Sequence, residues 1–335
     1  MKKLRVLVLA HGNFVPPEDI SVLSDDEQYD LKTEVDVIAA LRNLEHDVKV
    51  LGILDELVPI RETVEDWEPD IVFNLLEEFG GEAVYDQNVV AYLELLRVPY
   101  TGCSPRGMII ARDKALSKKL LAYHRIRCPR FKVARKGRSV QRPKALEFPI
   151  IVKSLNEEAS RGISRASIVE DEDALKARVA FVHERIRTDA ILEQFIPGRE
   201  LYVGILGNQR LTALPPRELM LLKRETDETL IATERMKHSI RYQEKYGVEV
   251  ASPKPLPAGV AEQLTRRSKR IYKILELEGY GRIDYRMDVQ GKLYFLEANP
   301  NPEIARFEEF ASAADAAGLS YEQLIQRILN LGLAR

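Results

Sequence analysis

Several features common in protein sequences are scarce in this chain, and each scarcity narrows its class. Two cysteines, Cys103 and Cys128, occur in 335 residues without a CxxC pair, so neither a disulfide framework nor a thiolate zinc site is expected. Lys and Arg number 50 against 52 Asp and Glu, and the formal net charge of -2 provides no overall basic field for a nucleic acid. No apolar run approaches the roughly 20 residues needed to cross a bilayer. We therefore expect a cytoplasmic protein without nucleic-acid or membrane partners.

Strand and helix patterns alternate over the first hundred residues. Apolar runs at 4–10, 47–53 and 70–76 predict strands, and apolar residues at helical spacing predict helices over 35–44 and 83–97. Strands that alternate with helices indicate a parallel sheet of the doubly wound type. Ligands of such sheets lie at the carboxyl ends of the strands, which here are near His11, Gly12 and residues 77–82.

A pattern of strands with longer loops follows Pro105. Ser104 and Pro105 are a typical helix N-cap and first helical residue, which predicts a helix over 106–124. A last helix is expected after Ser320, where Gln323 completes a capping box. The other expected elements are strands at 130–134, 148–153, 190–196 and 201–207 and a long helix at 257–277. The chain is thus predicted to be α/β followed by α+β.

The stretch 125–144 contains nine cations and no acid. Two interpretations are open: a docking patch for an acidic partner, or a solvated loop and edge strand whose Lys and Arg residues discourage aggregation. We favour the second, because charge runs usually mark solvated faces.

A hairpin with a metal site is predicted between Gly281 and Asn299. If residues 290–291 form a two-residue turn, Asp284 lies opposite Glu297 and Arg282 opposite Asn299, with all four on one face. Two carboxylates directly opposite each other are destabilising unless a positive group lies between them. With the amide of Asn299 they form a hard oxygen cluster suited to Mg²⁺, and incidental acids on an exposed hairpin are the alternative. The residues of the other face are expected to pack: Ile283, Tyr285, Met287 and Val289.

Short motifs follow one another along nearly the whole chain, although neither GxxxxGK[ST] nor GxGxxG occurs. They are the turn at 99–102, the pair Asp113 and Lys114, the strand at 148–153, the loop at 152–164, the segment 191–196, the segment 242–246, and the hairpin residues 281–284 and 297–299. In this order they resemble the D-alanine–D-alanine ligase branch of the ATP-grasp superfamily. The resemblance implies an ATP-grasp fold with an N-terminal parallel-sheet (preATP-grasp) domain at 1–105. A central lid subdomain at 106–196 and a C-terminal subdomain at 197–335, with the metal site and an ω-loop, would follow.

The resemblance also implies site residues and an activity. It implies an ATP-dependent ligase that activates a carboxylate as an acyl phosphate and joins it to an amine, with a metal neutralising the phosphate oxygens. Arg282 would stabilise the oxyanion of the tetrahedral intermediate. The remaining implied residues are Tyr246 and Ser160 for catalysis; Lys114, Lys153, Glu193, Ile196, Glu200 and Lys245 for ATP; and Asp284, Glu297 and Asn299 for two Mg²⁺ ions, with Mn²⁺ as an alternative.

The substrate half departs from the family pattern. Ala159 stands where the family has the serine of a hydrogen-bonded network. Glu303 and Arg306 lie where the family has a Pro-Gly and a downstream serine that bind the acceptor's carboxylate. Because glutamates cannot hold a carboxylate without an intervening cation, D-alanyl-D-alanine synthesis is not expected, and the acceptor is a neutral, cationic or larger amine. The acid that binds the substrate amine in the N-terminal domain is Glu18 or Glu34.

Three functions remain open. The leading hypothesis is a homodimeric ligase that joins small-molecule or peptide carboxylates and amines. The second is a ligase that modifies a peptide or protein terminus, with the stretch 125–144 as its docking patch. The third is a catalytically silent ATP-binding regulatory protein, which Ala159 favours and the intact lysine and metal-ligand set opposes.

Overall fold

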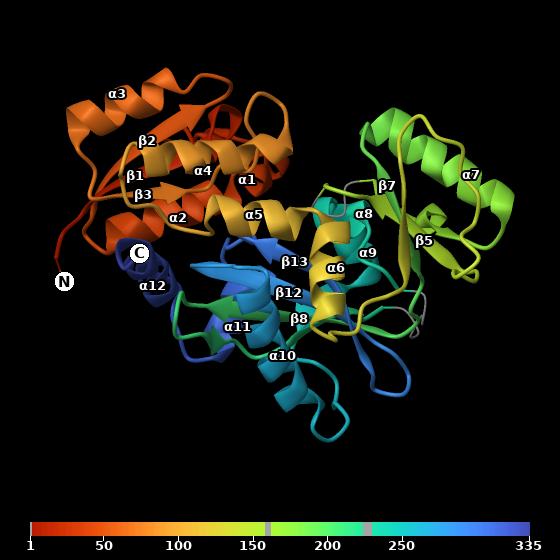
Figure 1. Ribbon diagram of the computed structural model, residues 1–335. Helices are drawn as coiled ribbons and strands as arrows, with labels where there is room; N and C mark the ends of the chain where they lie inside the picture. The colour runs from red at the N-terminus through yellow and green to blue at the C-terminus, as the bar shows by residue number, and fades with distance from the viewer. Residues whose placement is uncertain (1, 158–161, 224–229) are drawn as a thin grey trace.

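The computed structural model describes residues 2–157, 162–223 and 230–335, and three sheets organise these residues (Figure 1). The first sheet is parallel, with β1 (Arg5–His11) between β2 (Asp47–Ile53) and β3 (Ile71–Asn74). Its helices are α1 (Asp25–Asp30), α2 (Lys32–Asn43), α3 (Val58–Trp67) and α4 (Asp86–Leu95). The predicted N-terminal α/β unit is thus confirmed.

The second sheet is antiparallel and lies away from the first in Figure 1. Its order is β4 (Phe131–Ala134), β7 (Ala190–Gln194), β5 (Ile150–Ser154) and β6 (Ile168–Val169). Helix α7 (Glu172–Phe181) packs on it through Leu175 and Val179, which join Ile150 and Val152 of β5 in one buried cluster. Because side chains alternate along a strand, Ile151 and Lys153 face the opposite side, toward the rest of the protein.

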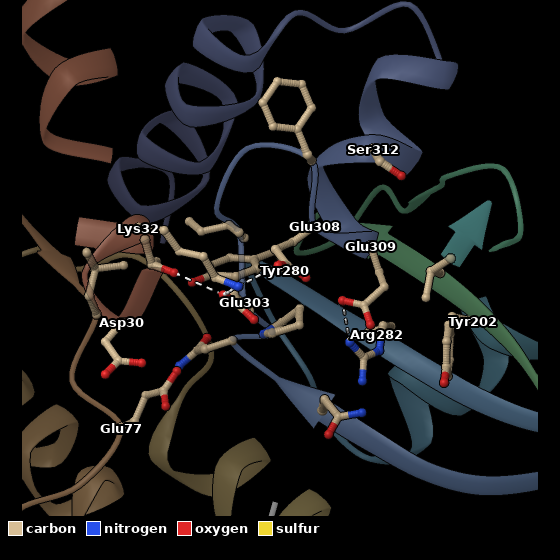
Figure 2. Close-up of a pocket in the computed structure, with 18 of the residues that line it drawn as sticks. Asp30, Lys32, Glu77, Tyr202, Tyr280, Arg282, Glu303, Glu308, Glu309 and Ser312 are labelled. Atoms are coloured by element: carbon tan, nitrogen blue, oxygen red, sulfur yellow. Dashed lines mark hydrogen bonds and ion pairs between the residues drawn. The ribbon is translucent and has the colours of Figure 1, made fainter. Parts of the chain in front are cut away.

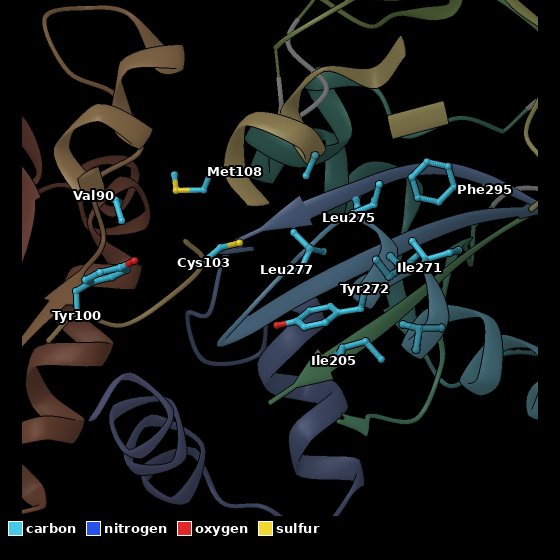
Figure 3. Close-up of a cluster of buried hydrophobic side chains, with 14 of the residues drawn as sticks. Val90, Tyr100, Cys103, Met108, Ile205, Ile271, Tyr272, Leu275, Leu277 and Phe295 are labelled. Carbon is cyan, nitrogen blue, oxygen red and sulfur yellow. The ribbon is translucent and has the colours of Figure 1, made fainter. Parts of the chain in front are cut away.

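The third sheet is also antiparallel, and helices pack on both of its faces through apolar side chains. Its order is β11 (Val248–Ala251), β10 (Arg217–Leu221), β8 (Arg199–Leu206), β12 (Tyr280–Met287) and β13 (Leu293–Pro300), and the short β9 (Thr212–Ala213) pairs with β8. Ile205 of β8 packs with Ile271 of α10 (Val260–Ile274) in the cluster drawn in Figure 3. The adjacent Leu206 packs instead with Phe310 of α11 (Glu309–Ala316). The central strand β12 is therefore buried along its whole length.

The last helix joins the third sheet to the first. Helix α12 (Tyr321–Leu333) buries Leu324 and Ile328 in the same cluster as Val6 of β1 and Phe73 of β3. In Figure 1 this C-terminal helix lies beneath the N-terminal sheet. The capping box predicted for Ser320 and Gln323 is present at its start. Among the described residues, no helix has the length and apolar character that a membrane span requires.

The helix predicted over 106–124 is two helices. Helix α5 (Pro105–Arg112) begins after the Ser104 cap as predicted, and α6 (Lys114–Tyr123) follows after a break at Asp113. The Asp113 backbone is extended, and its carboxylate accepts hydrogen bonds from two backbone N–H groups of α6, both at 2.9 Å. An Asp side chain that caps a new helix competes with continuation of the old one. The break makes Lys114 the first residue of α6. The two further helices of the described chain are α8 (Glu234–His238) and α9 (Ile240–Tyr246).

The predicted register of the C-terminal hairpin is correct in one half and wrong in the other. Arg282 pairs with Asn299 and Asp284 with Glu297, as expected. A bulge after Asp284 shifts the rest by one residue, so that Met287 faces Leu293. The turn is also longer than two residues, because the Asp288 N–H bonds to the Lys292 carbonyl at 3.0 Å. Val289, predicted to pack, is 76% exposed in this turn.

Candidate active site

A row of polar side chains crosses one face of three adjacent strands. Arg282, Asp284 and Arg286 share this face of β12, because they are two residues apart. Each lies beside residues of the neighbouring strands: Arg282 beside Asn299 of β13, Asp284 beside Glu297 of β13 and Tyr202 of β8, and Arg286 beside Glu200 of β8. The predicted metal ligands and the predicted catalytic arginine are therefore neighbours.

The predicted metal ligands fit a hard divalent cation. Arg282 donates to both oxygens of Asp284, at 2.8 and 3.0 Å, and the Asn299 amide donates to the same carboxylate at 2.9 Å. Glu297, directly opposite Asp284, lies 3.6 Å from the Lys114 ammonium. Two carboxylates and an amide oxygen are the donors that Mg²⁺ prefers. The described residues contain no cluster of three His, Cys, Asp or Glu ligands, so an amide ligand such as Asn299 would be needed as the third.

A buried lysine–glutamate–lysine set lies between the second and third sheets. Glu193 of β7 is 2.9 Å from Lys118 of α6 and 3.4 Å from Lys153 of β5. Burial opposes the ionised form of Glu193, but the two lysines outweigh it and lower the pKa of this carboxyl. Burial alone would lower the pKa of Lys153, but the carboxylates of Glu193, Glu297 and Glu200 raise it. Glu193 and Lys153 are therefore both charged at neutral pH.

These charged groups line a cavity with apolar walls, called here the nucleotide cavity. Lys153, Glu193, Ile196, Glu200, Asp284 and Glu297 all border it. Its apolar wall includes Ile151, Phe195 and Ile231, which pack together. Arg286 crosses its floor and donates to the Ile196 carbonyl and the Glu200 carboxylate, both at 2.9 Å. An apolar slot with charged groups at its end is a suitable shape for a flat base attached to phosphates.

A second, larger cavity of about 990 Å³ lies over the same face of the hairpin, at its Arg282 end, between the first and third sheets (Figure 2). Arg282 and Asn299 line it, and Tyr202 borders both cavities. The β12–β13 hairpin with the Tyr202 strand is thus a wall that the two cavities share. A ligand in one cavity and a ligand in the other can therefore meet at this wall.

Arg282 is held in place at the shared wall by two acids. Besides Asp284, it contacts Glu309 of α11 at 3.6 Å, and its guanidinium lies 4.9 Å from the centre of the Tyr202 ring. Burial would lower the pKa of Arg282, but Asp284 and Glu309 raise it well above its ordinary value. A fixed, permanently charged guanidinium at this point can stabilise negative charge that develops on a reacting oxygen.

Of the substrate residues predicted from the sequence, the structure brings two into the larger cavity. Glu34 of α2 and Glu303, after β13, both line it. Glu18 is exposed and does not line it, since the segment after η1 (Gly12–Phe14) carries it to the surface. The Arg306 side chain contacts Glu322 at 2.5 Å and Asp36 at 3.9 Å instead, so it links α12 to α2 outside the cavity.

Two predicted residues, Lys245 and Tyr246, lie outside both cavities. Lys245 is exposed and, like Tyr246, borders neither cavity, because both are on α9, where Lys245 lies over the Tyr246 ring at 5.1 Å. Gln243 of the same helix does line the larger cavity. Ser160 and the departure at Ala159 fall outside the described residues.

The sequence analysis missed Lys118, which contacts Glu193 behind the nucleotide cavity, and three residues that line the larger cavity. Lys118 follows Lys114 by four residues, so helical spacing could have indicated that both face the same site. Nothing local in the sequence distinguishes Lys32, Arg217 or Phe307, which come to the larger cavity from α2, β10 and the loop after β13.

Known proteins resemble this chain in sequence and in fold. The family described as "D-ala D-ala ligase C-terminus" matches residues 116–330. A D-alanine–D-alanine ligase of Bordetella avium is 32% identical over 76% of this chain and 79% of its own length. An uncharacterized protein, y4sG of Sinorhizobium fredii, is 32% identical over 79% of this chain and 75% of its own length. The structure of D-alanine–D-alanine ligase from Bacillus anthracis complexed with ATP matches with a TM-score of 0.75 and 23% identity, covering 99% of this chain and 98% of that one, and supports the fold.

The fold and the site together define an ATP-dependent ligase of the ATP-grasp type. The extent of the family match and the identity to its relatives show that the chain belongs to the D-alanine–D-alanine ligase family. Members of this family use ATP and a divalent metal. The expectation of an ATP-dependent enzyme that joins carbon to nitrogen is thereby confirmed at the level of the family.

Proposed function

We propose that the chain joins a carboxylate to an amine other than D-alanine, with cleavage of ATP and an acyl phosphate as the intermediate. The observation that carries this proposal is the wall shared by the two cavities. Asp284 and Glu297 border the nucleotide cavity, and Arg282 and Asn299, their neighbours in the sheet, border the larger one. A terminal phosphate and a substrate carboxylate can therefore meet at one strand pair.

The nucleotide cavity provides the groups that bind ATP, and the reaction takes place at the shared wall. Lys153, with Lys114 and Lys118 on α6, provides positive charge for the phosphates, and Glu200 is available for the ribose. The substrate carboxylate oxygen attacks the terminal phosphorus and ADP leaves. The amine nitrogen then attacks the acyl carbon and phosphate leaves, so that the sum of the two steps releases ADP, phosphate and a proton.

Arg282 is the residue placed to assist the second step. Its guanidinium is oriented by the two Asp284 oxygens and lines the larger cavity. In this position it can donate to the oxyanion that forms when the amine adds to the acyl carbon. Bound Mg²⁺, held by Asp284, Glu297 and Asn299, would neutralise the phosphate oxygens.

The amine is proposed to differ from D-alanine because the larger cavity is rich in carboxylates. Glu303, Glu308 and Glu309 follow the hairpin and all line this cavity. A carboxylate-bearing acceptor would be repelled there, although the named relatives are D-alanine–D-alanine ligases.

The test is a screen in which hydroxylamine replaces the amine. Amino acids and dipeptides are supplied as carboxylates with ATP and Mg²⁺, and hydroxamate and ADP are measured together. We expect hydroxamate and ADP in equal amounts with at least one carboxylate. Neither product with any carboxylate, in protein that binds ATP, would contradict the proposal.

A matched pair of variants links the activity to the wall. Arg282→Lys keeps the charge but loses the planar fork that holds Asp284, and we expect hydroxamate formation to fall about 100-fold. Arg266→Lys, the same change at an exposed residue of α10, should leave the rate unchanged.

A further inference from the structure

The larger cavity has a surplus of negative charge. Counted over the described residues that line it, nine carboxylate side chains accompany four Lys or Arg side chains. One of these cations, Arg112, is buried against Asp86 and belongs to the fold. Another, Arg282, is held by Asp284 and Glu309 at the shared wall. The surplus therefore lies in the part of the cavity away from Arg282.

The surplus is concentrated at one end of the cavity, called here the acid end and made up of Glu34, Glu77, Glu303 and Glu308. Figure 2 shows Glu77 and Glu303 on the side of Lys32, across the cavity from Arg282 and Tyr202. The acid end comes from α2, from the segment after β3 and from the segment after β13. A ligand whose reacting atom lies at the wall would extend its other end toward these carboxylates.

Lys32 shows what kind of group the acid end holds. Its ammonium lies 2.9 Å from Glu303 and 2.5 Å from Glu308, and 3.9 Å from the centre of the Tyr29 ring. Carboxylates combined with an aromatic face are a typical environment for an alkylammonium group. One lysine does not balance the set, since burial, Glu303 and Glu309 still raise the pKa of Glu308 to about 7.

Glu34 forms no ion pair with a cation of the described residues. Its residue is 6% exposed and lines the cavity, and its own backbone N–H is its hydrogen-bond donor among the described residues. Burial, with Glu77 and Glu303 nearby, raises the pKa of Glu34 to about 8. A buried carboxylate of this kind is destabilising unless a positive group compensates it.

Phe307 provides an apolar surface beside the same carboxylates. It is 94% exposed, lines the cavity and follows Glu303 in the loop after β13. Phe14 and Tyr29 line the cavity from the N-terminal domain. Exposed aromatic rings next to carboxylates suit the methylene chain and charge of an organic amine, and they offer nothing to a carboxylate.

The reacting amine cannot itself supply the missing charge. Its nitrogen needs a free electron pair to attack the acyl carbon, so it must be neutral at that moment. A monoamine would then leave the acid end uncompensated. An amine with a second basic nitrogen keeps a positive charge at the acid end while the first nitrogen reacts.

We propose that the amine substrate is an aliphatic diamine without a carboxylate, with its distal ammonium held by Glu34 and Glu303 and its reacting nitrogen at the Arg282 end. The proposal rests on the proposed ligase function, whose substrate class it specifies. Because ligand binding needs no turnover, the two can fail separately: the hydroxylamine screen tests the ligase, and binding tests the diamine.

The experiment is calorimetric titration of the full-length chain in the presence of Mg²⁺ and a non-hydrolysable ATP analogue. The probes are 1,4-diaminobutane, n-butylamine and D-alanine. We expect the diamine to bind at least about tenfold more tightly than either of the others. Equal affinity for diamine and monoamine, or tighter binding of D-alanine, would overturn the proposal.

Variants test whether the acid end is responsible. Glu34→Gln should weaken diamine binding about tenfold or more, with little effect on n-butylamine. Glu62→Gln, the same change on an exposed face of α3, should bind the diamine like the parent chain. If Glu34→Gln fails to fold, Glu303→Gln at the partly exposed rim serves the same test. Unchanged diamine affinity in a folded variant would contradict the assignment.

Discussion

The two cavities that follow one another along one face of the β12–β13 hairpin balance their charges differently. In the nucleotide cavity, Glu193 has two lysine partners and Glu200 has Arg286. Among the described residues, the carboxylates of the larger cavity outnumber the cations, and the buried Glu34 has no ion-pair partner there. In the nucleotide cavity, the folded chain itself thus provides cation partners for both carboxylates. The larger cavity has a surplus of carboxylates over cations, which the proposed diamine substrate would compensate.

Of the predicted variants, Glu297→Ala should reduce turnover most, because Glu297 is on the wall that the two cavities share. We expect ATP-dependent turnover to fall at least about 1,000-fold, since the position combines the proposed metal binding with the Lys114 contact. The side chain is 27% exposed, so the melting temperature should hardly change. ADP release with the carboxylate found in the screen measures the effect.

Glu262→Gln, an exposed acid on α10, is the control for this experiment and should turn over normally. Normal turnover in folded Glu297→Ala would remove Glu297 from the metal site. It would also remove the main reason to regard the hairpin as the wall where the two cavities meet.

Much of this wall could be predicted from the sequence because its determinants are local. Alternation along a strand and pairing across a hairpin bring Arg282, Asp284 and Glu297 together from one short segment. The bulge after Asp284 could not be predicted in this way, since the turn at Asp288 and the burial of β12 on both faces decide the register of the outer half.

The larger cavity could be predicted only in part because its residues converge through tertiary packing. Lys32 lies on α2, about 270 residues before Glu303 in the chain, and no spacing rule connects the two. The sequence indicated Glu303 and Arg306 as candidates and left Glu18 and Glu34 as alternatives. Only the packing of α12 on the first sheet shows that Arg306 links α12 to α2 instead.

Asp86→Asn tests whether this acid of the larger cavity stabilises the fold and is not part of the proposed ligand site. Asp86 and Arg112 form a buried ion pair, with side chains 4% and 6% exposed. Removing the Asp86 charge takes away the ion-pair partner of the buried Arg112, so we expect the free energy of unfolding to fall by about 3 kcal/mol. Urea unfolding measures this loss. Asp66→Asn on the exposed face of α3 should cause no comparable loss, and an unchanged midpoint for Asp86→Asn would show that the pair is not structural.

Lys153→Met tests the nucleotide cavity, where two lysines balance the buried carboxylate of Glu193. Glu193 keeps Lys118 at 2.9 Å in this variant, so the fold should persist. The loss of one charge-assisted contact to the phosphates should raise the Kd for ATP about 10- to 100-fold. Calorimetric titration with ATP measures the change, and Lys176→Met on α7, where the lysine is 57% exposed, is the matched control. Equal Kd values for the two variants would mean that Lys153 serves Glu193 and not the nucleotide.

Glu34→Gln tests the surplus of negative charge in the larger cavity through the pH dependence of the free energy of unfolding. The pKa of Glu34 is raised to about 8 from an ordinary value of 4.5, so between these pH values the folded chain binds more protons here than the unfolded chain does. Its contribution to the free energy of unfolding therefore decreases as pH rises from about 4.5 to 8 and is then constant. Gln lacks this titration, and Glu77 and Glu303, which face Glu34, remain in both proteins.

We therefore expect Glu34→Gln to stabilise the empty protein more at pH 8 than at pH 5, by about 1–2 kcal/mol once water in the cavity has screened the charge. Thermal or urea unfolding at the two pH values measures this difference, and Glu62→Gln should show none. Saturating 1,4-diaminobutane should reduce or reverse the advantage of the variant at pH 8, because the diamine compensates Glu34 in the parent chain alone. A stability difference that is the same at both pH values would mean that Glu34 is already compensated, and the two cavities would then not differ in the way described.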